Sequence, residues 1–568
     1  MSGELLHARP FTRFTPPKHP RVAMVSWLLR TLALTLAVSS DVVDVFGARI
    51  QTPFIRLPSD AAARRQDVKD IFLTSWNAYK EFAFPHDDLT PLSESFTDGR
   101  NGFGASAVDA LSTLFIIGEE EIFEEIVNFT SHIDFTISHT TDTVSIFETT
   151  IRYLAGMLSA YELSGKKYPA LIKQANILGT KLSGAFINGN KVPFGELDFN
   201  TSIPVIQTSN IAEAGTLTLE WSRLAKYTGN DTFRALAENS VRQIASLPAP
   251  IPGIPAQGID PSTGQSVGAF VTWGGGSDSY LEYLIKYARI TNTNDNLFAD
   301  TWATAVDSSI HTLLRTSTVG NHTYLADLDD SATIRHVGSH LACFMAGNWI
   351  MGGKLLNNNT IVNIGLALNE GCWNTYASTA TGIGPEAFGY ISSDGDFTGS
   401  GDPSPGNLAF YNRNGFYILP GNSDYFMRPE VLESNFYAYR ATGDVKFFER
   451  AVSATNSFAT FLKTPTVAFA PIDDVDSTDS DFIDDMESFW FAEVLKYLYL
   501  TFDDPNRISL DNFVFNTEAH PFIAPAEKPV YGSGKLRSAS EFEPFKATSG
   551  PLPLVSFSPK LPTKIPDQ

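Results

Sequence analysis

Cysteine and basic residues are both scarce in this chain. Only 2 of its 568 residues are cysteine, which excludes a disulfide-stapled miniprotein and a zinc ribbon. Lys and Arg number 41 against 63 Asp and Glu, so the formal net charge is −22. Nucleic acids and anionic membranes bind basic surfaces, so we expect neither as a partner. Charged residues make up 18% of the chain and hydrophobic residues 43%, which predicts a globular protein with a large core.

The chain also lacks an uninterrupted run of about 20 apolar residues, the length that a membrane-spanning helix requires. A shorter apolar stretch, Thr31–Val38, lies within Met24–Ser40 and predicts a secretory signal. Two readings of the basic segment before Met24 stay open: translation begins at Met24, or the segment belongs to a signal anchor. We expect a leader over residues 1–48 and a protein that is secreted or held in the Golgi or ER lumen. Five N-x-S/T sequons favour the same route, at Asn128, Asn200, Asn230, Asn321 and Asn358.

Helical periodicity dominates after Ala61, and short turns of Gly, Asn or Asp separate successive helices. Turns recur about every 60 to 65 residues over most of the chain, which is the period of a helical hairpin. Seven hairpins are compatible with a closed ring, and an irregular helical domain is the equal alternative from spacing alone. The seven predicted turns lie at Gly118, Leu158–Gly165, Leu219–Asn230, Leu281–Asp295, Ile350–Asn359, Phe436–Asp444 and Leu495–Asp504.

Segments between the hairpins are long and rich in Gly, Pro and Asn, notably Pro248–Gly276 and Ser392–Gly421, which is typical of functional loops. The Pro/Ser/Lys-rich end of the chain has no sustained period. We therefore expect one helical domain over residues 60–523 and a disordered tail over residues 524–568.

Motifs of several large enzyme classes are absent. The chain has no G-x-S-x-G elbow, Walker loop, H-E-x-x-H zinc motif or Rossmann fingerprint. Carboxylates at three predicted helix starts are the remaining candidates for chemistry: Glu148, which precedes Arg152 by four residues, Asp278 after a Gly-Gly-Gly run, and Glu430 after Arg428-Pro429. Taken singly, an i,i+4 ion pair, a helix cap and a charge at the positive end of a helix dipole explain them.

Their combination points to glycosidic hydrolysis. If the hairpins alternate up and down around a ring, the three helix starts converge at one end of it. One carboxylic acid then protonates the leaving oxygen, and one carboxylate activates water.

At this point the sequence resembles the class I α-1,2-mannosidases of glycoside hydrolase family 47, in their fungal secretory form, from about Phe72 to Pro521. The matching motifs are long, ordered and correctly spaced: GASAVDALSTLFIIG (Gly104–Gly118), FETTIR (Phe147–Arg152), SDSYLEYLIK (Ser277–Lys286), SHLACF (Ser339–Phe344), GPEAF (Gly384–Phe388), RPEVLESNFYAYRATGD (Arg428–Asp444), MESFWFAEVLKYLYL (Met486–Leu500) and TEAHP (Thr517–Pro521).

The resemblance implies an all-α fold, an (α/α)7 barrel with small β-hairpins in its loops. It also implies an inverting mechanism with Glu148 as the general-acid candidate, Glu430 as general base, and Asp278 in the proton-delivery network. Which carboxylate protonates the leaving oxygen directly, and which acts through water, stays open. Glu386 is a further acidic candidate at the pocket. One Ca²⁺ is implied, with Thr517 as its only direct protein ligand, through the carbonyl and hydroxyl oxygens. Because Ca²⁺ takes six to eight oxygens, waters and surrounding acids must complete such a site.

Further residues follow from the matching motifs. Cys343 and Cys372 coincide with the paired cysteines of the family, which implies one disulfide. Phe489 is expected to stack on the mannose, and His340 to lie near the cleft. The acidic run Asp473–Asp485 lacks the glycine of an EF-hand loop and is interpreted as a solvated loop. The acids expected around the calcium are Glu213, Glu282, Glu433, Glu487 and Glu493. The residues expected to bind substrate are Arg152, Glu213, Glu282, His340, Arg428, Glu433, Phe489 and Glu493.

Gly276 departs from the narrow-specificity ER members, which carry Arg there, and this indicates a roomier cleft. The expected activity is that of an exo-α-1,2-mannosidase that trims high-mannose N-glycans on glycoproteins from Man9GlcNAc2 to Man5GlcNAc2, and we expect a monomer. A mannosidase-like lectin of glycoprotein quality control is the alternative, and release of free mannose distinguishes the two. A different α/α-toroid glycosidase leaves TEAHP unexplained. Other departures, Ser277, Ser112 and Val431, remove no proposed catalytic carboxylate.

Overall fold

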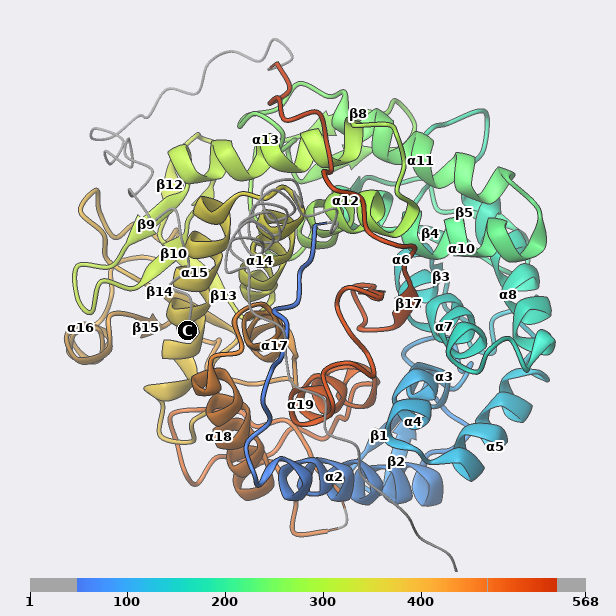
Figure 1. Ribbon diagram of the computed structural model, residues 1–568, viewed down its shortest axis with the longest axis horizontal. Coiled ribbons are helices and arrows are strands. Elements are labelled where there is room, and N and C mark those ends of the chain that lie inside the picture. The colour runs from blue at the N-terminus through green and yellow to red at the C-terminus, as the bar shows by residue number, and fades with distance from the viewer. Residues whose placement is uncertain (1–47, 467, 539–568) are drawn as a thin grey trace, which may run out of the picture. The chain divides into compact units, whose positions relative to one another are not determined.

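The computed structural model of the chain describes residues 48–466 and 468–538. In this part of the chain, long helices form a ring of two layers (Figure 1). The inner layer consists of α4 (Leu111–Ile117), α7 (Ala155–Leu163), α10 (Thr218–Thr228), α12 (Asp278–Thr291), α14 (Phe344–Leu355), α17 (Glu430–Thr442) and α19 (Leu495–Phe502). The outer layer consists of α5 (Glu120–Thr130), α8 (Pro169–Leu182), α11 (Thr232–Ala245), α13 (Leu297–Thr312), α15 (Asn359–Ala377), α18 (Val445–Phe461) and α2 (Ala61–Phe82).

Short turns join each inner helix to the outer helix that follows it. Gly118, after α4, and Gly443, after α17, have φ values of +79° and +73°, a left-handed conformation that glycine adopts without strain and that ends a helix. Six helical hairpins arise in this way, and each packs its two helices together. The expected turns at Gly118, Leu158–Gly165, Leu219–Asn230, Leu281–Asp295, Ile350–Asn359 and Phe436–Asp444 are confirmed.

The seventh pair is formed differently from the prediction. No outer helix follows α19 among the described residues, so Leu495–Asp504 is not a hairpin turn. Instead α19 packs against α2, the first described helix, and the two ends of the helical region close the ring. The expected (α/α)7 barrel is therefore confirmed, with six sequential hairpins and one pair made by distant segments.

The inner helices differ from the outer ones in how much of their surface is buried. On α12, every residue from Ser279 to Ile290 is buried, whereas α11 buries only part of its surface, a stripe that includes Phe233 and Val241. A helix with one apolar stripe faces solvent on its other side, as α11 does. The inner helix α12 is enclosed on all sides and buries even the charged Glu282, Lys286 and Arg289. One continuous core runs between the layers, and a smaller aromatic core around Tyr390 and Phe416 lies beside it.

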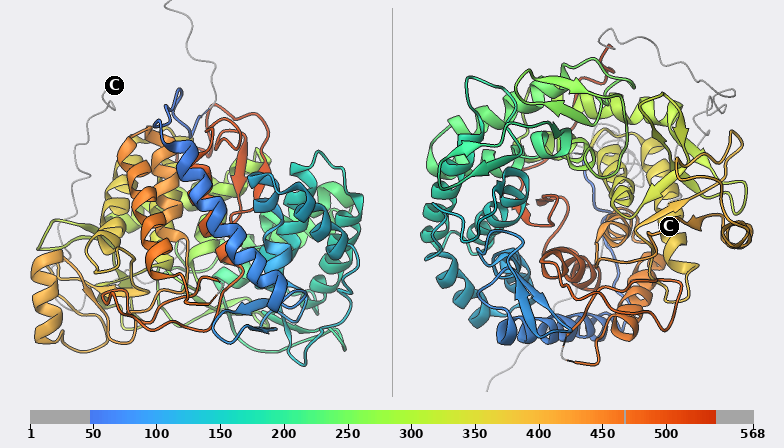
Figure 2. Two further views of the ribbon diagram at one scale, coloured as in Figure 1. Left: turned by 90° about the horizontal axis from the view of Figure 1, so that it is seen from below. Right: turned by 180° about the vertical axis from the view of Figure 1, so that it is seen from behind.

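Loops at one end of the ring lead into the inner helices, and Figure 2 (left) shows this loop-rich edge below the helices. They contain short helices and small antiparallel sheets. The short helices are α3 (Ala105–Asp109), α6 (Ile146–Thr149), α9 (Ile211–Gly215), α16 (Pro405–Asn414), the 3₁₀ turns η2 (Ser183–Ala185) and η3 (Leu341–Cys343), and the π-helical segments η1 (Thr150–Leu154) and η4 (Trp490–Val494).

The small sheets have two or three strands each, as expected for hairpins in loops. They are β1 (Asp88–Thr90) with β2 (Ser95–Thr97); β3 (Val144–Ser145), β4 (Glu196–Asp198) and β5 (Ile203–Pro204); β6 (Ser209–Asn210), β7 (Gly258–Asp260) and β8 (Gln265–Val267); β9 (Leu314–Thr316) with β10 (Thr323–Leu325); β11 (Asp327–Leu328) with β12 (Ile334–Arg335); and β13 (Val337–Ser339), β14 (Ala387–Gly389) and β15 (Tyr417–Ile418).

A last hairpin, β16 (Phe513–Phe515) with β17 (Pro521–Ile523), projects into the ring (Figure 1). Phe513 faces Ile523 and Phe515 faces Pro521 across the two strands. The turn between the strands carries Thr517, whose N–H donates to the Tyr283 hydroxyl on the inner helix α12.

The segment after β17 differs from the expected tail. Residues 524–538 make defined contacts: Lys528 Nζ donates to the Thr293 carbonyl oxygen at 2.7 Å, and the Ser533 hydroxyl donates to Asp300 at 2.7 Å. The boundary expected at residue 524 is therefore wrong for these residues, because backbone and side-chain hydrogen bonds fix them to the ring. Residues 539–568 of the expected tail, and the leader except for Ala48, lie outside the described residues.

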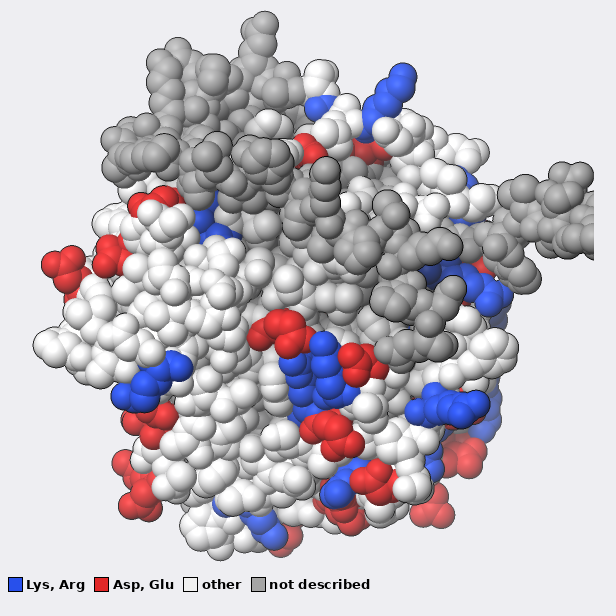
Figure 3. Space-filling model, turned by 60° about the vertical axis from the view of Figure 1, so that its left-hand side comes forward, with Lys and Arg blue, Asp and Glu red and all other residues white. Residues whose placement is uncertain are grey.

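Charged side chains on the outer surface occur in mixed groups. On the face that Figure 3 shows, Lys and Arg lie beside Asp and Glu. One such group joins α15 to α18, where Glu370 pairs with Lys446 at 3.1 Å and with Arg450 at 2.5 Å. Among the helices of the described residues, none is long and apolar enough to cross a membrane.

Candidate active site

A cavity of about 520 Å³ opens at the loop-rich end of the ring. Its size is typical of ligand-binding clefts. The lining is strongly acidic, with nine carboxylates against three arginines: Glu148, Glu196, Glu213, Asp278, Glu282, Glu430, Glu433, Glu493 and Glu518 against Arg100, Arg152 and Arg428. The three predicted catalytic carboxylates thus line one cavity, although they lie far apart in the sequence.

Glu148 is held at the edge of this cavity by a cap and two arginines. The Ser145 hydroxyl caps α6 by accepting the Glu148 N–H at 3.2 Å. Arg152 Nε donates to Glu148 Oε2 at 2.7 Å, so the i,i+4 pair expected from the sequence is formed, and Arg100 Nε lies 4.0 Å away. Burial opposes ionisation, but Arg152 and Arg100 outweigh it and hold the pKa of Glu148 below its ordinary value.

Asp278 is the first residue of α12, directly after the glycine loop. The Asp278 and Ser277 N–H groups both donate to the Gly274 carbonyl oxygen, which starts the helix. Burial, together with repulsion from Glu282 and Glu430, raises the pKa of Asp278 to about 7. The side chain can therefore hold a proton near neutral pH, in contrast to Glu148.

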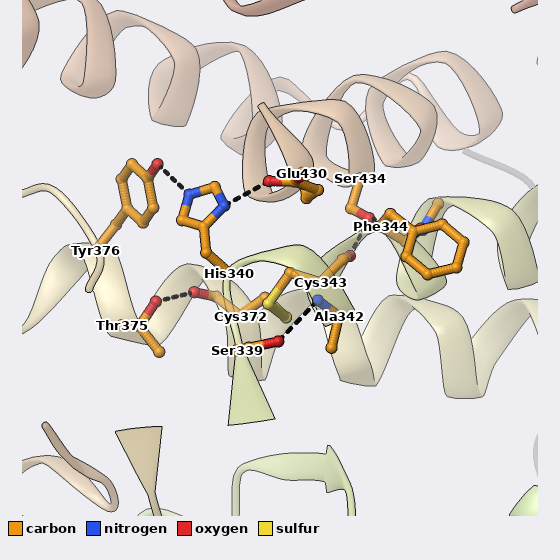
Figure 4. Close-up of a disulfide and its surroundings, with 11 residues drawn as sticks. Ser339, His340, Ala342, Cys343, Phe344, Cys372, Thr375, Tyr376, Glu430 and Ser434 are labelled. Carbon is orange, nitrogen blue, oxygen red and sulfur yellow. Dashed lines mark hydrogen bonds and ion pairs between the residues drawn. A yellow bond between two sulfur atoms is a disulfide. The ribbon is translucent and has the colours of Figure 1, made fainter. Parts of the chain in front are cut away.

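Glu430 begins α17 and receives a hydrogen bond from a buried histidine. His340 Nδ1 lies 2.7 Å from Glu430 Oε2, and His340 Nε2 lies 2.8 Å from the Tyr376 hydroxyl (Figure 4). Burial would raise the pKa of Glu430, but His340 and Arg428 lower it below its ordinary value. Glu430 is therefore ionised, as Glu148 is, and is suited to accept a proton.

The predicted substrate residues divide into two groups. Lining the cavity are Arg152, Glu213, Glu282, Arg428, Glu433, Phe489 and Glu493. His340 does not line it, and acts on it only through Glu430. Glu386 does not line it either: it binds Arg428 Nε at 2.5 Å and the Phe426 N–H at 3.1 Å. The expectation that Glu386 faces the pocket is therefore not met, because Arg428 stands between.

Phe489 lies between two of the arginines. The guanidinium carbons of Arg152 and Arg428 are 5.5 Å and 5.9 Å from the centre of its ring. Such cation–π contacts fix the ring at the cavity wall, where only 7% of the residue is exposed. An aromatic face in this position can pack against the apolar face of a sugar.

At the bottom of the cavity, carboxylates crowd around few cations. Lys286 pairs with Glu282 and lies 3.9 Å from Glu433, and Arg152 pairs with Glu518. Burial and repulsion from neighbouring carboxylates raise the pKa values of Glu433 and Glu493 well above the ordinary range. An uncompensated group of buried carboxylates of this kind favours a bound cation.

Thr517 reaches this acidic floor from the β16–β17 turn. Its N–H donates to the Tyr283 hydroxyl at 3.3 Å, and no residue in the described ranges donates to its carbonyl or hydroxyl oxygen. Within residues 48–466 and 468–538, no three His, Cys, Asp or Glu side chains are placed to ligate one ion. The donor set thus suits an oxygen-seeking cation held by Thr517 and water, with the carboxylates outside the direct ligands.

Three charged lining residues were missed by sequence reasoning: Arg100, Glu196 and Glu518. Glu518 stands in the TEAHP motif beside Thr517, so this motif could have identified it as a lining residue. Arg100 and Glu196 lie in loops whose folding brings them to the cavity. The π-helical segments η1 and η4, which carry Arg152 and Glu493, were also missed, although such segments often occur at functional sites.

Features outside the cavity agree with an oxidising compartment. Cys343 and Cys372 form the expected disulfide, which lies next to His340 and Tyr376 (Figure 4). All five sequon asparagines are exposed, so each can be reached for glycosylation. The Asp473–Asp485 loop keeps most of its aspartates exposed, as expected of a solvated loop.

Comparison with known proteins identifies consistent relatives. Residues 71–524 match the sequence model of glycosyl hydrolase family 47. The mannosyl-oligosaccharide alpha-1,2-mannosidase 1B of Aspergillus phoenicis is 37% identical over 516 residues, which cover 87% of this chain and 98% of that protein. The mannosyl-oligosaccharide alpha-1,2-mannosidase of Coccidioides posadasii is 39% identical over 481 residues, or 81% of this chain and 90% of that protein. The solved structure of an alpha-1,2-mannosidase from Trichoderma reesei superimposes with a TM-score of 0.78 at 36% identity, over 82% of this chain and 99% of that chain.

Proposed function

Because the chain belongs to glycosyl hydrolase family 47, we propose that it is an exo-α-1,2-mannosidase that removes terminal α-1,2-linked mannose from high-mannose N-glycans. The observation that carries this proposal is the meeting of Glu148, Asp278 and Glu430 in one cavity. The names of the relatives, all mannosyl-oligosaccharide mannosidases, favour hydrolysis over the lectin alternative.

In the proposed mechanism the anomeric carbon is inverted. Glu430, ionised and hydrogen-bonded to His340, takes a proton from the water that attacks the anomeric carbon. The glycosidic oxygen receives a proton as its bond to that carbon breaks. Asp278, with its pKa raised to about 7, supplies this proton. Glu148, which Arg152 and Arg100 keep ionised, orients the transfer of this proton to the glycosidic oxygen. Phe489 packs against the ring of the reacting sugar.

We further propose that the enzyme depends on Ca²⁺. The oxygens of Thr517 would hold the ion, and the surrounding carboxylates would bind its waters. When bound, the ion supplies a fixed positive charge that binds and orients hydroxyl groups of the terminal mannose. The excess of nine carboxylates over three arginines around the cavity supports a cation at this place.

Gly276 supports a broad choice of glycan branches, from Man9GlcNAc2 through to Man5GlcNAc2. It lines the cavity without a side chain, and its φ of +85° disfavours any other residue. A Cβ atom here would lie 2.6 Å from Gln257 Nε2, so even a small side chain at residue 276 would crowd this part of the cavity wall. A time course that stops at a single Man8 isomer would contradict this range. The disulfide and the exposed sequons support work inside the secretory pathway or after secretion. We propose that the enzyme acts there as a monomer.

The decisive experiment replaces the proposed base. We expect Glu430→Gln to lower release of mannose from Man9GlcNAc2 by about 10³-fold, within the range that general base catalysis contributes, with an unchanged fold and unchanged Ca²⁺ binding. Glu449→Gln, an exposed carboxylate on α18, is the matched control. NMR of the released sugar should show β-mannose first, as inversion requires. Near-normal turnover of Glu430→Gln would require another base.

A further inference from the structure

A second, smaller cavity lies beside the active-site cavity. Its volume is about 170 Å³, several times the roughly 30 Å³ that one water occupies in the liquid. Gly275 lines both cavities. Gly275 is itself exposed, so it forms a surface ridge between the two openings. A ligand of several sugar units in the active site can therefore reach both.

The ridge is narrow because of its glycines. A Cβ atom on Gly274 would lie 3.2 Å from the Thr272 hydroxyl oxygen and 3.3 Å from the Ser339 hydroxyl oxygen, both of which line the small cavity. The missing side chain thus leaves these hydroxyls open to the cavity. The same Gly274 accepts the Asp278 N–H through its carbonyl oxygen, so this wall also starts the helix that bears a proposed catalytic carboxylate.

Asp327 contributes a carboxylate to the wall of the small cavity. Its side chain is half-buried, and Thr272 is its hydrogen-bonding neighbour. Arg335, opposite Asp327 in the β11–β12 pair, donates instead to the Thr398 carbonyl oxygen. Asp327 therefore has no ion-pair partner within the described part of the chain. Burial raises its pKa to about 6, although the Thr272 hydrogen bond and the charge of Arg335 act in the opposite direction.

Apolar groups complete the walls. Phe270, Leu325 and Val337 line the cavity, and the buried Trp273 is fixed by a 2.8 Å hydrogen bond from its Nε1 to Ser309. The Ser339 hydroxyl oxygen accepts the Ala342 N–H, which leaves its own proton free to donate. One acceptor carboxylate, hydroxyl groups and an aromatic wall match a sugar ring, which has hydroxyls at its edge and C–H groups on its faces.

We propose that this cavity is a subsite for a mannose residue of a second branch of the same glycan, with Asp327 accepting hydrogen bonds from its hydroxyls. The inference rests on the proposed function, since it assigns the subsite to the substrate whose terminal mannose enters the active site. Asp327 is then a specificity-determining residue that takes no part in the chemistry. Short substrates do not reach it, and branched ones gain affinity from it.

The test compares a branched and a short substrate in the same variants. For Asp327→Ala we expect kcat/KM on Man9GlcNAc2 to fall about tenfold, and kcat/KM on α-1,2-mannobiose to stay within twofold of the wild type. Val337→Phe, which fills the cavity and leaves Asp327 in place, should have the same effect. Asp402→Ala, an exposed aspartate before α16, is the matched control and should change neither value.

The outcomes separate the two proposals. If the wild type releases mannose from neither substrate, the proposed function fails. If the wild type cleaves both, and both variants keep the wild-type ratio of the two kcat/KM values, the subsite is overturned. Circular dichroism and the melting temperature show whether each variant is folded. If Asp327→Ala does not fold, the kcat/KM ratio of Val337→Phe decides the test. An equal loss on both substrates in a folded variant also overturns the subsite, because it indicates a disturbed Asp278.

Discussion

The imidazole of His340 contacts the carboxylate of Glu430, with 2.7 Å between Nδ1 and Oε2 (Figure 4). On the opposite edge of the imidazole, the Tyr376 hydroxyl lies 2.8 Å from His340 Nε2. If this hydroxyl donates to Nε2, the proton of the neutral ring must sit on Nδ1 and point to Glu430. Tyr376 is thus a positioning residue for the proposed base.

Removal of this hydroxyl should raise the pKa of Glu430. In Tyr376→Phe the imidazole is free to place its proton on Nε2, and Glu430 then loses the hydrogen bond that favours its ionised form. We expect the acid limb of the kcat/KM profile to move to higher pH, with a several-fold loss near pH 5 and a smaller loss near pH 7. Tyr411→Phe, in the separate aromatic core, is the control. A uniform loss at every pH would indicate a merely structural role.

Arg100 should contribute to protonation of the leaving oxygen, through its effect on the pKa of Glu148. Its guanidinium lies 4.0 Å from Glu148 and 3.4 Å from Glu487, and it lines the cavity. In Arg100→Met, Glu148 keeps Arg152 but loses its second positive neighbour, so its pKa should rise. We expect kcat/KM to fall about tenfold, measured on α-1,2-mannobiose. Arg413→Met, on α16, should have no effect, and equal rates for both variants would contradict the role of Arg100.

Much of the fold could be predicted because inner and outer helices alternate with short turns that end in residues such as Gly118 and Gly443. The pairing of α2 with α19 could not, because the two helices are separated by most of the chain and no local pattern links them. Contacts of this kind depend on the closure of the whole ring, which hydrophobic periodicity does not report.

The candidate site shows the same division. Glu148, Asp278 and Glu430 could be predicted because each stands at a helix start within a recognisable motif. The places of Glu386 and His340 could not, since both are polar residues in matching motifs, yet one binds Arg428 and the other binds Glu430 from behind. Sequence distinguishes a lining residue from its supporting neighbour poorly, because both require the same side-chain chemistry.

The disulfide should stabilise both the fold and the His340 contact. Cys343 follows His340 by three residues and Cys372 precedes Tyr376 by four, so the bond ties the two segments that hold the imidazole. Closing a loop with a sequence separation of 29 is worth about 3–4 kcal/mol in the chain-entropy model. We expect Cys343→Ser with Cys372→Ser to lower the melting temperature and kcat together. A thermal melt in the absence and presence of reductant checks this, and an unchanged melting temperature would contradict it.

Removal of Ca²⁺ should abolish activity and leave the helices in place. In the proposed site Thr517, which lines the cavity, would contribute its carbonyl and hydroxyl oxygens, so Thr517→Val removes the hydroxyl and keeps the carbonyl and the shape of the side chain. We expect this variant to bind Ca²⁺ more weakly in calorimetry, and a chelator to stop mannose release by the wild type. Addition of Ca²⁺ should restore the wild type fully. Thr460→Val, on the exposed side of α18, is the control, and full activity in excess chelator would contradict the calcium proposal.

The pH profile tests the division of labour between Glu430 and Asp278. Glu430 must be ionised to accept a proton, and its pKa is lowered, so activity is lost only when the pH falls below the ordinary range of a glutamate. Asp278 must be protonated to supply a proton, and its pKa is raised to about 7, so activity is lost as the pH rises through that value. The expected kcat/KM profile is a bell with its alkaline limb near pH 7. Asp278→Asn cannot supply the proton and should be nearly inactive at every pH, whereas the exposed control Asp402→Asn should keep the wild-type bell. A wild-type plateau that extends to pH 9 would remove Asp278 from proton delivery and leave that role to Glu148.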